Sequence, residues 1–168
     1  PLRSAFKQAP LCMLRVIALT MTGSVLYYLG FIYLPEYLSL SHFLSRNEAL
    51  SFQSYCLTAM LILVPLGGWV CDRIGRRRAY LLMTASCLIG SVPIFWLLQQ
   101  KSLGAIVFAL ILLILISSLE QGTTSATVVE QFPTSLRYSG ISPSYNITQA
   151  IFGGTAPATA LFLMSFFN

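Results

Sequence analysis

Residues 69–79 read WVCDRIGRRRA, a short run of charge between two long stretches that carry no charge. Four of the ten basic residues in this 168-residue chain fall within positions 73–78. Charged residues make up only 9% of the sequence, whereas 56% of it is hydrophobic. A basic turn between two uncharged spans is typical of a membrane protein whose helices reverse at the cytoplasmic surface.

The composition of the whole chain favours the same class of protein. In soluble domains about a quarter of the residues are charged, and a water-soluble protein of this length could not enclose so much apolar surface in one core. The net charge of +5 would suit a nucleic-acid-binding protein, but the basic residues lie at the ends of uncharged stretches, where membrane orientation explains them. We therefore expect a polytopic membrane protein that binds no nucleic acid.

Stretches with little or no charge mark the expected membrane-spanning helices, because about 20 apolar residues are needed to cross the hydrocarbon layer. Five stretches meet this requirement, and the last contains proline and glycine, which helix bundles in membranes tolerate. Their approximate bounds are 11–38, 49–71, 79–100, 102–129 and 138–167. The predicted fold class is an all-α membrane protein with five transmembrane helices.

The basic residues also predict the orientation of the chain. Eight of the ten fall on one side of the membrane in the five-helix arrangement, and Arg46 and Lys101 fall on the other. The eight are Arg3, Lys7, Arg15, Arg73, Arg76, Arg77, Arg78 and Arg137. Since positive loops stay in the cytoplasm, we expect a multi-pass protein of the plasma (bacterial inner) membrane with a cytoplasmic N-terminus.

The basic turn has a specific pattern, Gly68-x-x-x-Asp72-Arg73-x-Gly75-Arg76-Arg77-Arg78. This pattern resembles the signature loop of the major facilitator superfamily, which joins the second and third helices of each six-helix half. Gly75 permits a tight reversal. Asp72 at a helix C-terminus needs a partner, such as a nearby arginine or the N-terminus of another helix, because the helix dipole disfavours a carboxylate there. A charge-paired corner of this kind can act as a conformational latch. The candidate latch residues here are Gly68, Asp72, Arg73, Gly75 and Arg76, whereas Arg77 and Arg78 are interpreted as holding the loop in the cytoplasm.

Two further stretches carry the resemblance. Residues 130–138 read EQFPTSLRY, which looks like the loop between the tenth and eleventh helices of metabolite:proton symporters and sugar porters. Glu130 and Arg137 could pair across this turn and Pro133 would set its shape, so these three residues complete the candidate latch. Tyr145-Asn146 followed by IFGGTAP at 151–157 resembles the eleventh helix of the metabolite:proton symporter family, which includes proline/betaine, dicarboxylate and shikimate carriers.

Together the resemblances imply that residues 1–168 are the C-terminal transmembrane half-domain of such a transporter, helices seven to eleven of a six-helix half-bundle. They imply proton-coupled symport of a small polar metabolite or osmolyte by alternating access, and no enzymatic activity. The implied partners are the lipid bilayer, the solute, a proton, and either the N-terminal half of the same transporter or a second copy. The alternative is a half-carrier or fragment that acts as a membrane interaction module without transporting alone.

Glu120 is the only acidic residue within a predicted span away from the turns. A charged carboxylate at membrane depth costs a few kcal/mol or more without a partner, so it is a functional hypothesis by default. An intramembrane carboxylate that takes up and releases a proton would serve a proton-coupled carrier. The alternative is a carboxylate that faces the cytoplasmic vestibule or pairs with an arginine of a turn.

Polar side chains recur at helical spacing in two of the predicted spans. In the fifth, Tyr145, Asn146 and Gln149 belong to one polar face, and in the first, Tyr27 and Tyr28 belong to a smaller polar set. Aromatic rings with hydroxyl groups, amides and one carboxylate suit a small polar solute. These five residues and Glu120 are the predicted cavity residues, and hydrogen bonding between helices is the alternative for each of them.

The sequence predicts no cofactor and no metal site. The four cysteines, at positions 12, 56, 71 and 87, have no C-x-x-C spacing, and the chain has a single histidine, His42, in a predicted outer loop. No Ser/His/Asp set or phosphate-binding loop is present in the sequence, so a membrane enzyme has little support.

Overall fold

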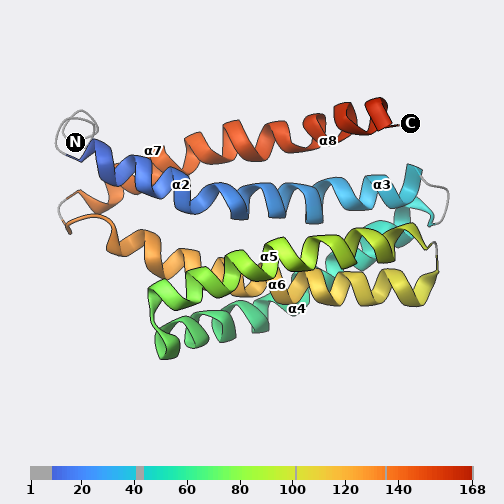
Figure 1. The fold of residues 1–168 in the computed structure, drawn as a ribbon, viewed down its shortest axis with the longest axis horizontal. Coiled ribbons are helices and arrows are strands. Elements are labelled where there is room, and N and C mark those ends of the chain that lie inside the picture. Colours follow the sequence, from blue (N-terminus) through green and yellow to red (C-terminus); the bar gives the residue numbers. More distant parts are fainter. Residues whose placement is uncertain (1–8, 41–43, 101, 135, 168) are drawn as a thin grey trace. The chain divides into compact units, whose positions relative to one another are not determined.

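The computed structural model describes residues 9–40, 44–100, 102–134 and 136–167, which are helical apart from short turns (Figure 1). The first helical run consists of α2 (Pro10–Tyr27), the π-helical segment η1 (Tyr28–Tyr33) and α3 (Leu34–Leu40). Long helices follow as α4 (Arg46–Ile74), α5 (Arg76–Gln99) and α6 (Leu103–Glu130). The last run consists of α7 (Arg137–Thr148), the π-helical segment η2 (Gln149–Gly153) and α8 (Gly154–Phe167). Lys101 and His42 lie outside the described residues.

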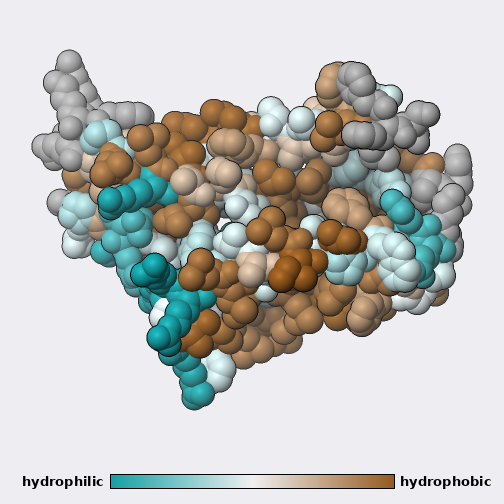
Figure 2. Space-filling model, in the orientation of Figure 1, coloured by the Kyte–Doolittle hydropathy of each residue, from teal (hydrophilic) through white to brown (hydrophobic). Residues whose placement is uncertain are grey.

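Four helical runs in the described part of the chain are long and apolar enough to cross a membrane: Pro10–Leu40, Arg46–Ile74, Arg76–Gln99 and Leu103–Glu130. The fifth predicted stretch is helical from α7 through η2 to α8, although it is not among these four. Hydrophobic residues cover the flanks of the helices, and hydrophilic residues gather near helix ends (Figure 2). The predicted all-α membrane bundle is confirmed.

Many apolar side chains point away from the rest of the chain, as in a protein whose solvent is lipid. Leu61 on α4 is 76% exposed, and Ile89 on α5 is 74% exposed. Burying such side chains against lipid tails removes them from water as effectively as a protein core would. The chain therefore does not need to enclose its apolar surface.

The two π-helical segments each lie just before a proline. Pro35 follows η1, and its position four residues after Phe31 is where a proline ring collides with the helical carbonyl. Pro157 stands in the same relation to Gly153, the last residue of η2. Widening the helix to a π turn is one way to accommodate a proline without breaking the helix.

The chain divides into two compact units. The first combines the described residues of Pro1–Tyr33 and Thr124–Asn168, and the second is formed by Leu34–Thr123. The boundaries fall inside continuous helices, at the end of η1 and within α6.

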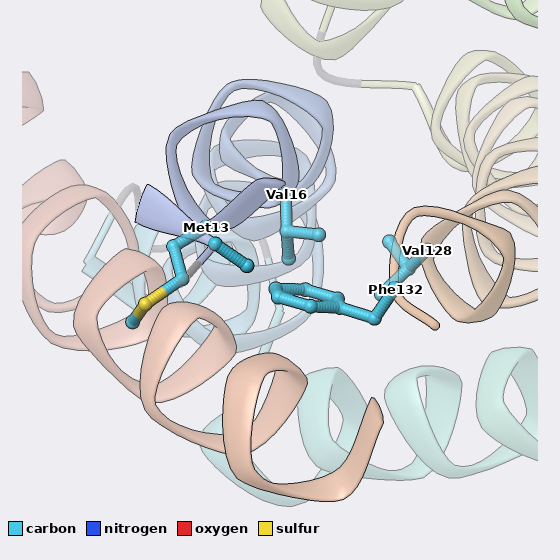
Figure 3. Packing of buried hydrophobic residues seen from close by; sticks show 5 residues of the cluster. Met13, Val16, Val128 and Phe132 are labelled. Atoms are coloured by element: carbon cyan, nitrogen blue, oxygen red, sulfur yellow. The ribbon is translucent and has the colours of Figure 1, made fainter. Parts of the chain in front are cut away.

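The core of the first unit gathers around Phe132, in the turn between α6 and α7. Its ring is 2% exposed and packs with Met13, Val16 and Val128 (Figure 3). Gly140 on α7 provides the space for this ring, because a Cβ atom added there would lie 2.2 Å from Phe132 Cε1. The turn between the predicted fourth and fifth spans is therefore held by a buried aromatic side chain.

The second unit is organised by a close crossing of α4 and α6. A Cβ atom added to Gly122 on α6 would lie 2.4 Å from the backbone nitrogen of Gly68 on α4. A Cβ atom added to Gly67 would lie 2.4 Å from the carbonyl oxygen of Ser118. Glycine on both helices lets the two backbones touch, which is the packing that small residues give in membranes.

Candidate functional site

The basic turn between α4 and α5 has the charge pairing that the sequence predicted for Asp72. Arg76 forms a salt bridge with Asp72 from one turn further along the chain, and its guanidinium also contacts Cys71 Sγ at 3.4 Å. Gly75 between the two helices has φ 86°, a left-handed conformation that favours glycine. The carboxylate of Asp72 at the end of α4 is thus neutralised by an arginine of the same turn, Arg76.

The remaining arginines of this turn behave differently from Arg76. The guanidinium of Arg73 lies over the ring of Trp69, with Cζ 4.1 Å from the ring centroid, which is a cation–π arrangement. Arg77 and Arg78 are exposed. Gly68, the first residue of the predicted motif, lies in the crossing of α4 with α6 and so contributes packing there.

The turn between α6 and α7 contains the other predicted latch residues. The carbonyl of Pro133 accepts a hydrogen bond from the backbone N–H of Leu136 at 3.0 Å, which closes the turn. Nε of Arg137 is buried and has no hydrogen-bond partner among the described residues. An ion pair between Glu130 and Arg137 stays a prediction.

Phe132 was quoted in the sequence motif without a role, and the structure makes it the anchor of this turn. The signal that could have identified it is Gly140, which lies eight positions later and is the fourth residue of α7. A glycine inside a helix is not needed for a turn, so its presence indicates that a neighbouring side chain occupies the space where a Cβ atom would be.

Glu120 lies on α6 and is 4% exposed. Ser117, Ser118 and Thr123 surround it in sequence and are also buried. The hydroxyl groups of Ser117 and Ser118 have no hydrogen-bond partner among the described residues. This part of α6 therefore brings a carboxyl group and several hydroxyl groups into the interior of the second unit.

The polar residues of α7 divide into two faces. Ser144 and Thr148 are fully buried, and Thr148 accepts a hydrogen bond of 3.1 Å from Thr20 on α2. Tyr145 and Asn146 are exposed, and the amide of Asn146 donates to the carbonyl of Ser142 on its own helix. The two predicted cavity residues of α7 thus lie on its exposed face, and their role in a solute cavity stays a prediction.

The other predicted cavity residues of the first unit come together at the π-helical segments. The edge of the Tyr28 ring lies against Gly153, where an added Cβ atom would be 2.6 Å from Tyr28 Cε2 and 3.1 Å from Gln149 Oε1. Tyr27 packs against Tyr28, with ring centroids 6.1 Å apart. Tyr27, Tyr28 and Gln149 therefore form one cluster, whereas the cavity prediction assigned them only to separate helix faces.

None of the described residues form a group of histidine, cysteine and carboxylate side chains that could hold a metal ion. The free cysteines at positions 12, 56, 71 and 87 form no disulfide.

Comparisons with a family profile and with known proteins agree on one family. The Major Facilitator Superfamily profile matches residues 1–166. The ectoine/proline transporter ProP of Corynebacterium glutamicum is 33% identical over 132 residues, which are 79% of this chain and 26% of that protein. The proline/betaine transporter of Escherichia coli is 30% identical over 152 residues, 90% of this chain and 30% of that protein. The alpha-ketoglutarate permease of Escherichia coli is 32% identical over 151 residues, 89% of this chain and 35% of that protein.

The chain spans between about a quarter and a third of the length of these relatives. No solved structure gives a significant match. The named relatives are transporters and permeases, in agreement with the symporter branch that the motifs resemble. With a profile match over nearly its whole length and apolar helices suited to a bilayer, this chain belongs to the Major Facilitator Superfamily.

Proposed function

We propose that this chain supplies one half of a secondary transporter that carries a small polar solute together with protons. The observation that carries the proposal is Glu120, a carboxyl group that is 4% exposed on a helix apolar enough to span the membrane. A carboxylate in this position is costly unless it is protonated or paired. Gain and loss of its proton would therefore change the energy of the surrounding helices, which is how a proton gradient can drive a conformational change.

The exposed polar face of α7 supports a role in solute transport. Tyr145 is 45% exposed, and Asn146 is exposed beside it. Lipid would be a poor solvent for this face, because amide and hydroxyl groups lose their hydrogen bonds to water there. A second half-bundle of the same transporter, or a second copy of this chain, would cover the face and leave a polar cavity between the halves.

The basic corner between α4 and α5 supports the proposed orientation and the proposed latch. Arg77 and Arg78 are exposed cations that favour the cytoplasmic surface. The pair of Asp72 and Arg76 is exposed and so contributes little stability by itself. A weak pair of this kind is suited to being made in one conformation of a carrier and exchanged in the other.

The experiment that tests the proposal uses the full-length protein in proteoliposomes. Uptake of proline, ectoine, betaine and alpha-ketoglutarate is measured with and without an inward proton gradient, and exchange of solute is measured without any gradient. We expect gradient-driven accumulation of one of these solutes. Glu120→Gln should abolish the accumulation and its pH dependence but leave solute exchange, because the amide keeps the shape of the carboxyl group and cannot cycle a proton.

The matched control is Glu36→Gln, which removes an exposed carboxylate at the start of α3. It should leave both accumulation and exchange unchanged. Proton-driven accumulation that survives in Glu120→Gln would reject the assigned role of Glu120. Absence of transport by the full-length wild-type protein for every solute would favour the half-carrier that acts as an interaction module.

A further inference from the structure

The two π-helical segments of the first unit lie against each other. η1 packs on α8 and α2 packs on η2, and the ring of Tyr28 from η1 touches Gly153 of η2. π turns are uncommon inside α-helices and are frequently found at functional sites, because the extra residue redirects side chains and loosens the backbone ladder. Here the redirected side chains include Tyr28 from one segment and Gln149 from the other.

Aromatic rings gather at this place. Tyr27 lies 6.1 Å from Tyr28 and 5.5 Å from Phe31, measured between ring centroids. Phe31 is buried, whereas Tyr27 and Tyr28 are only partly buried and so can be reached by a solute. The faces of aromatic rings carry partial negative charge and attract cations, quaternary ammonium groups above all.

The side-chain carbonyl oxygen of Gln149 is a hydrogen-bond acceptor that lies near the Tyr28 ring. Gln149 Oε1 is buried and has no hydrogen-bond partner among the described residues. It lies next to Gly153, the residue on which the Tyr28 ring rests. A buried carbonyl oxygen without a donor is unfavourable, so a ligand that brings an N–H group or a positive charge to it would be stabilised.

The two helical runs that contribute the cluster carry no charged side chain near it. Positions 16–35 contain no charged residue, and neither do positions 138–168. The two helical runs that contribute the cluster thus provide no arginine or lysine in these stretches to bind a carboxylate. Rings and a carbonyl oxygen are the chemistry of a site for a cation.

We infer that Tyr27, Tyr28 and Gln149 form a subsite for the ammonium group of a zwitterionic amine solute. The rings of the two tyrosines surround the alkylated nitrogen, and Gln149 Oε1 faces the positive charge. The inference rests on the proposed function and deepens it, because it assigns to this half the cationic end of the solute. A carboxylate on the same solute would have to be bound by residues outside this cluster.

The test compares two probes of the same shape, N,N,N-trimethylglycine and 3,3-dimethylbutanoate, in which a neutral carbon replaces the ammonium nitrogen. Equilibrium binding of radiolabelled trimethylglycine is measured on the full-length protein in nanodiscs, without a proton gradient. We expect the neutral analogue to compete about tenfold more weakly, because only the ammonium group interacts with the rings and the oxygen. Equal competition by the two probes, or no binding of trimethylglycine to the wild-type protein, would overturn the inference.

Variants separate the contribution of the ring from that of the hydroxyl. Tyr28→Leu should weaken trimethylglycine binding about tenfold, whereas Tyr28→Phe should stay within about twofold of the wild type, because the ring carries the interaction. Gln149→Leu should also weaken it several-fold. Unchanged binding in both Tyr28→Leu and Gln149→Leu, with helicity and monodispersity preserved, would contradict the assignment.

Gly153 and Gly154 provide a matched pair of structural variants. Gly153→Ala places a Cβ atom 2.6 Å from the Tyr28 ring, so it should displace the ring and weaken binding. Gly154→Ala meets its nearest neighbour at 3.8 Å and should leave binding unchanged. Equal binding by these two variants would show that the ring position does not matter for the ligand, and would reject the subsite.

Failure of the proposed subsite can be distinguished from failure of the proposed proton coupling. Glu36→Gln should retain trimethylglycine binding, because Glu36 belongs neither to the subsite nor to the proposed proton coupling. If the variants change binding as expected but the protein shows no proton-driven transport, the proposed coupling is rejected and the subsite is supported. If proton-driven transport does not depend on Tyr28 and Gln149, the subsite is rejected and the coupling is supported.

Discussion

At the scale of single residues, this chain relies on side chains that fill space left by glycine. Phe132 fills the space at Gly140, and Tyr28 fills the space at Gly153. In both cases an aromatic ring touches the backbone of a helix, which a methyl group would prevent. Such contacts are tight, and tightly packed interiors lose stability when even one carbon atom is added.

Gly140→Ala is therefore expected to destabilise the protein by about 1–3 kcal/mol, since its Cβ atom would collide with the buried Phe132 ring. Thermal unfolding of the purified protein in detergent measures the loss. The control is Gly104→Ala, at a site with open space around it, which should have no such effect. Combining Gly140→Ala with Phe132→Leu should recover part of the loss, and a loss that does not depend on residue 132 would contradict this packing.

At the scale of helices, the contact between α4 and α6 is made by backbone rather than by long side chains. Gly67 meets the carbonyl of Ser118, and Gly122 meets the backbone of Gly68. Close approach of backbones increases van der Waals contact, which is a main source of helix association in lipid. Because backbone atoms cannot rotate away as side chains can, this crossing has little tolerance for substitution.

Gly122→Ala should separate α4 from α6 and lower the free energy of unfolding by about 1–3 kcal/mol, because its Cβ atom would overlap backbone atoms. Gly68→Ala is the comparison at the same crossing, where the nearest atom would be at 3.9 Å, an ordinary contact. Thermal unfolding of the two variants side by side should show a lower midpoint for Gly122→Ala alone. Equal midpoints would mean that the crossing is looser than described.

At the scale of the whole molecule, the chain is a set of helices whose apolar flanks require a bilayer and whose ends carry the charge. Asn47 lies in the first turn of α4, and Arg77 follows its last residue Ile74 across the turn. A helix of this length crosses the hydrocarbon layer once. The two positions should therefore lie on opposite sides of the membrane, and the basic turn should be the cytoplasmic one.

This orientation is tested with single cysteines in a cysteine-free background of the full-length protein. Arg77→Cys should react with a membrane-impermeant maleimide only after the cells are permeabilised, whereas Asn47→Cys should react in intact cells. Both residues are exposed, so access to the reagent decides the result. Labelling of Arg77→Cys in intact cells would reverse the proposed orientation, and labelling of both positions from one side would mean that α4 does not cross.

Much of the fold was accessible from the sequence because its causes are local. Runs of apolar residues set the helices, and the Asp-Arg-x-Gly-Arg turn predicted the reversal at Gly75. The sequence also predicted a partner for Asp72, either a nearby arginine or the N-terminus of another helix, and the partner is Arg76. The π-helical segments were not predicted, although a proline follows each of them. The role of Phe132 was also not predicted, because an aromatic residue in a turn has several possible neighbours.

The amino-acid sequence by itself determined that this protein is a membrane helix bundle of the Major Facilitator Superfamily, because transfer energies and motif spacing act over neighbouring residues. Only the tertiary structure decided which face of each helix is buried. It placed Thr148 against Thr20, 128 positions away, and left Tyr145 exposed. It also placed Tyr28 and Gln149 beside the same residue, Gly153. Contacts between distant segments depend on how helices approach one another, and helical periodicity within one segment does not specify its neighbour.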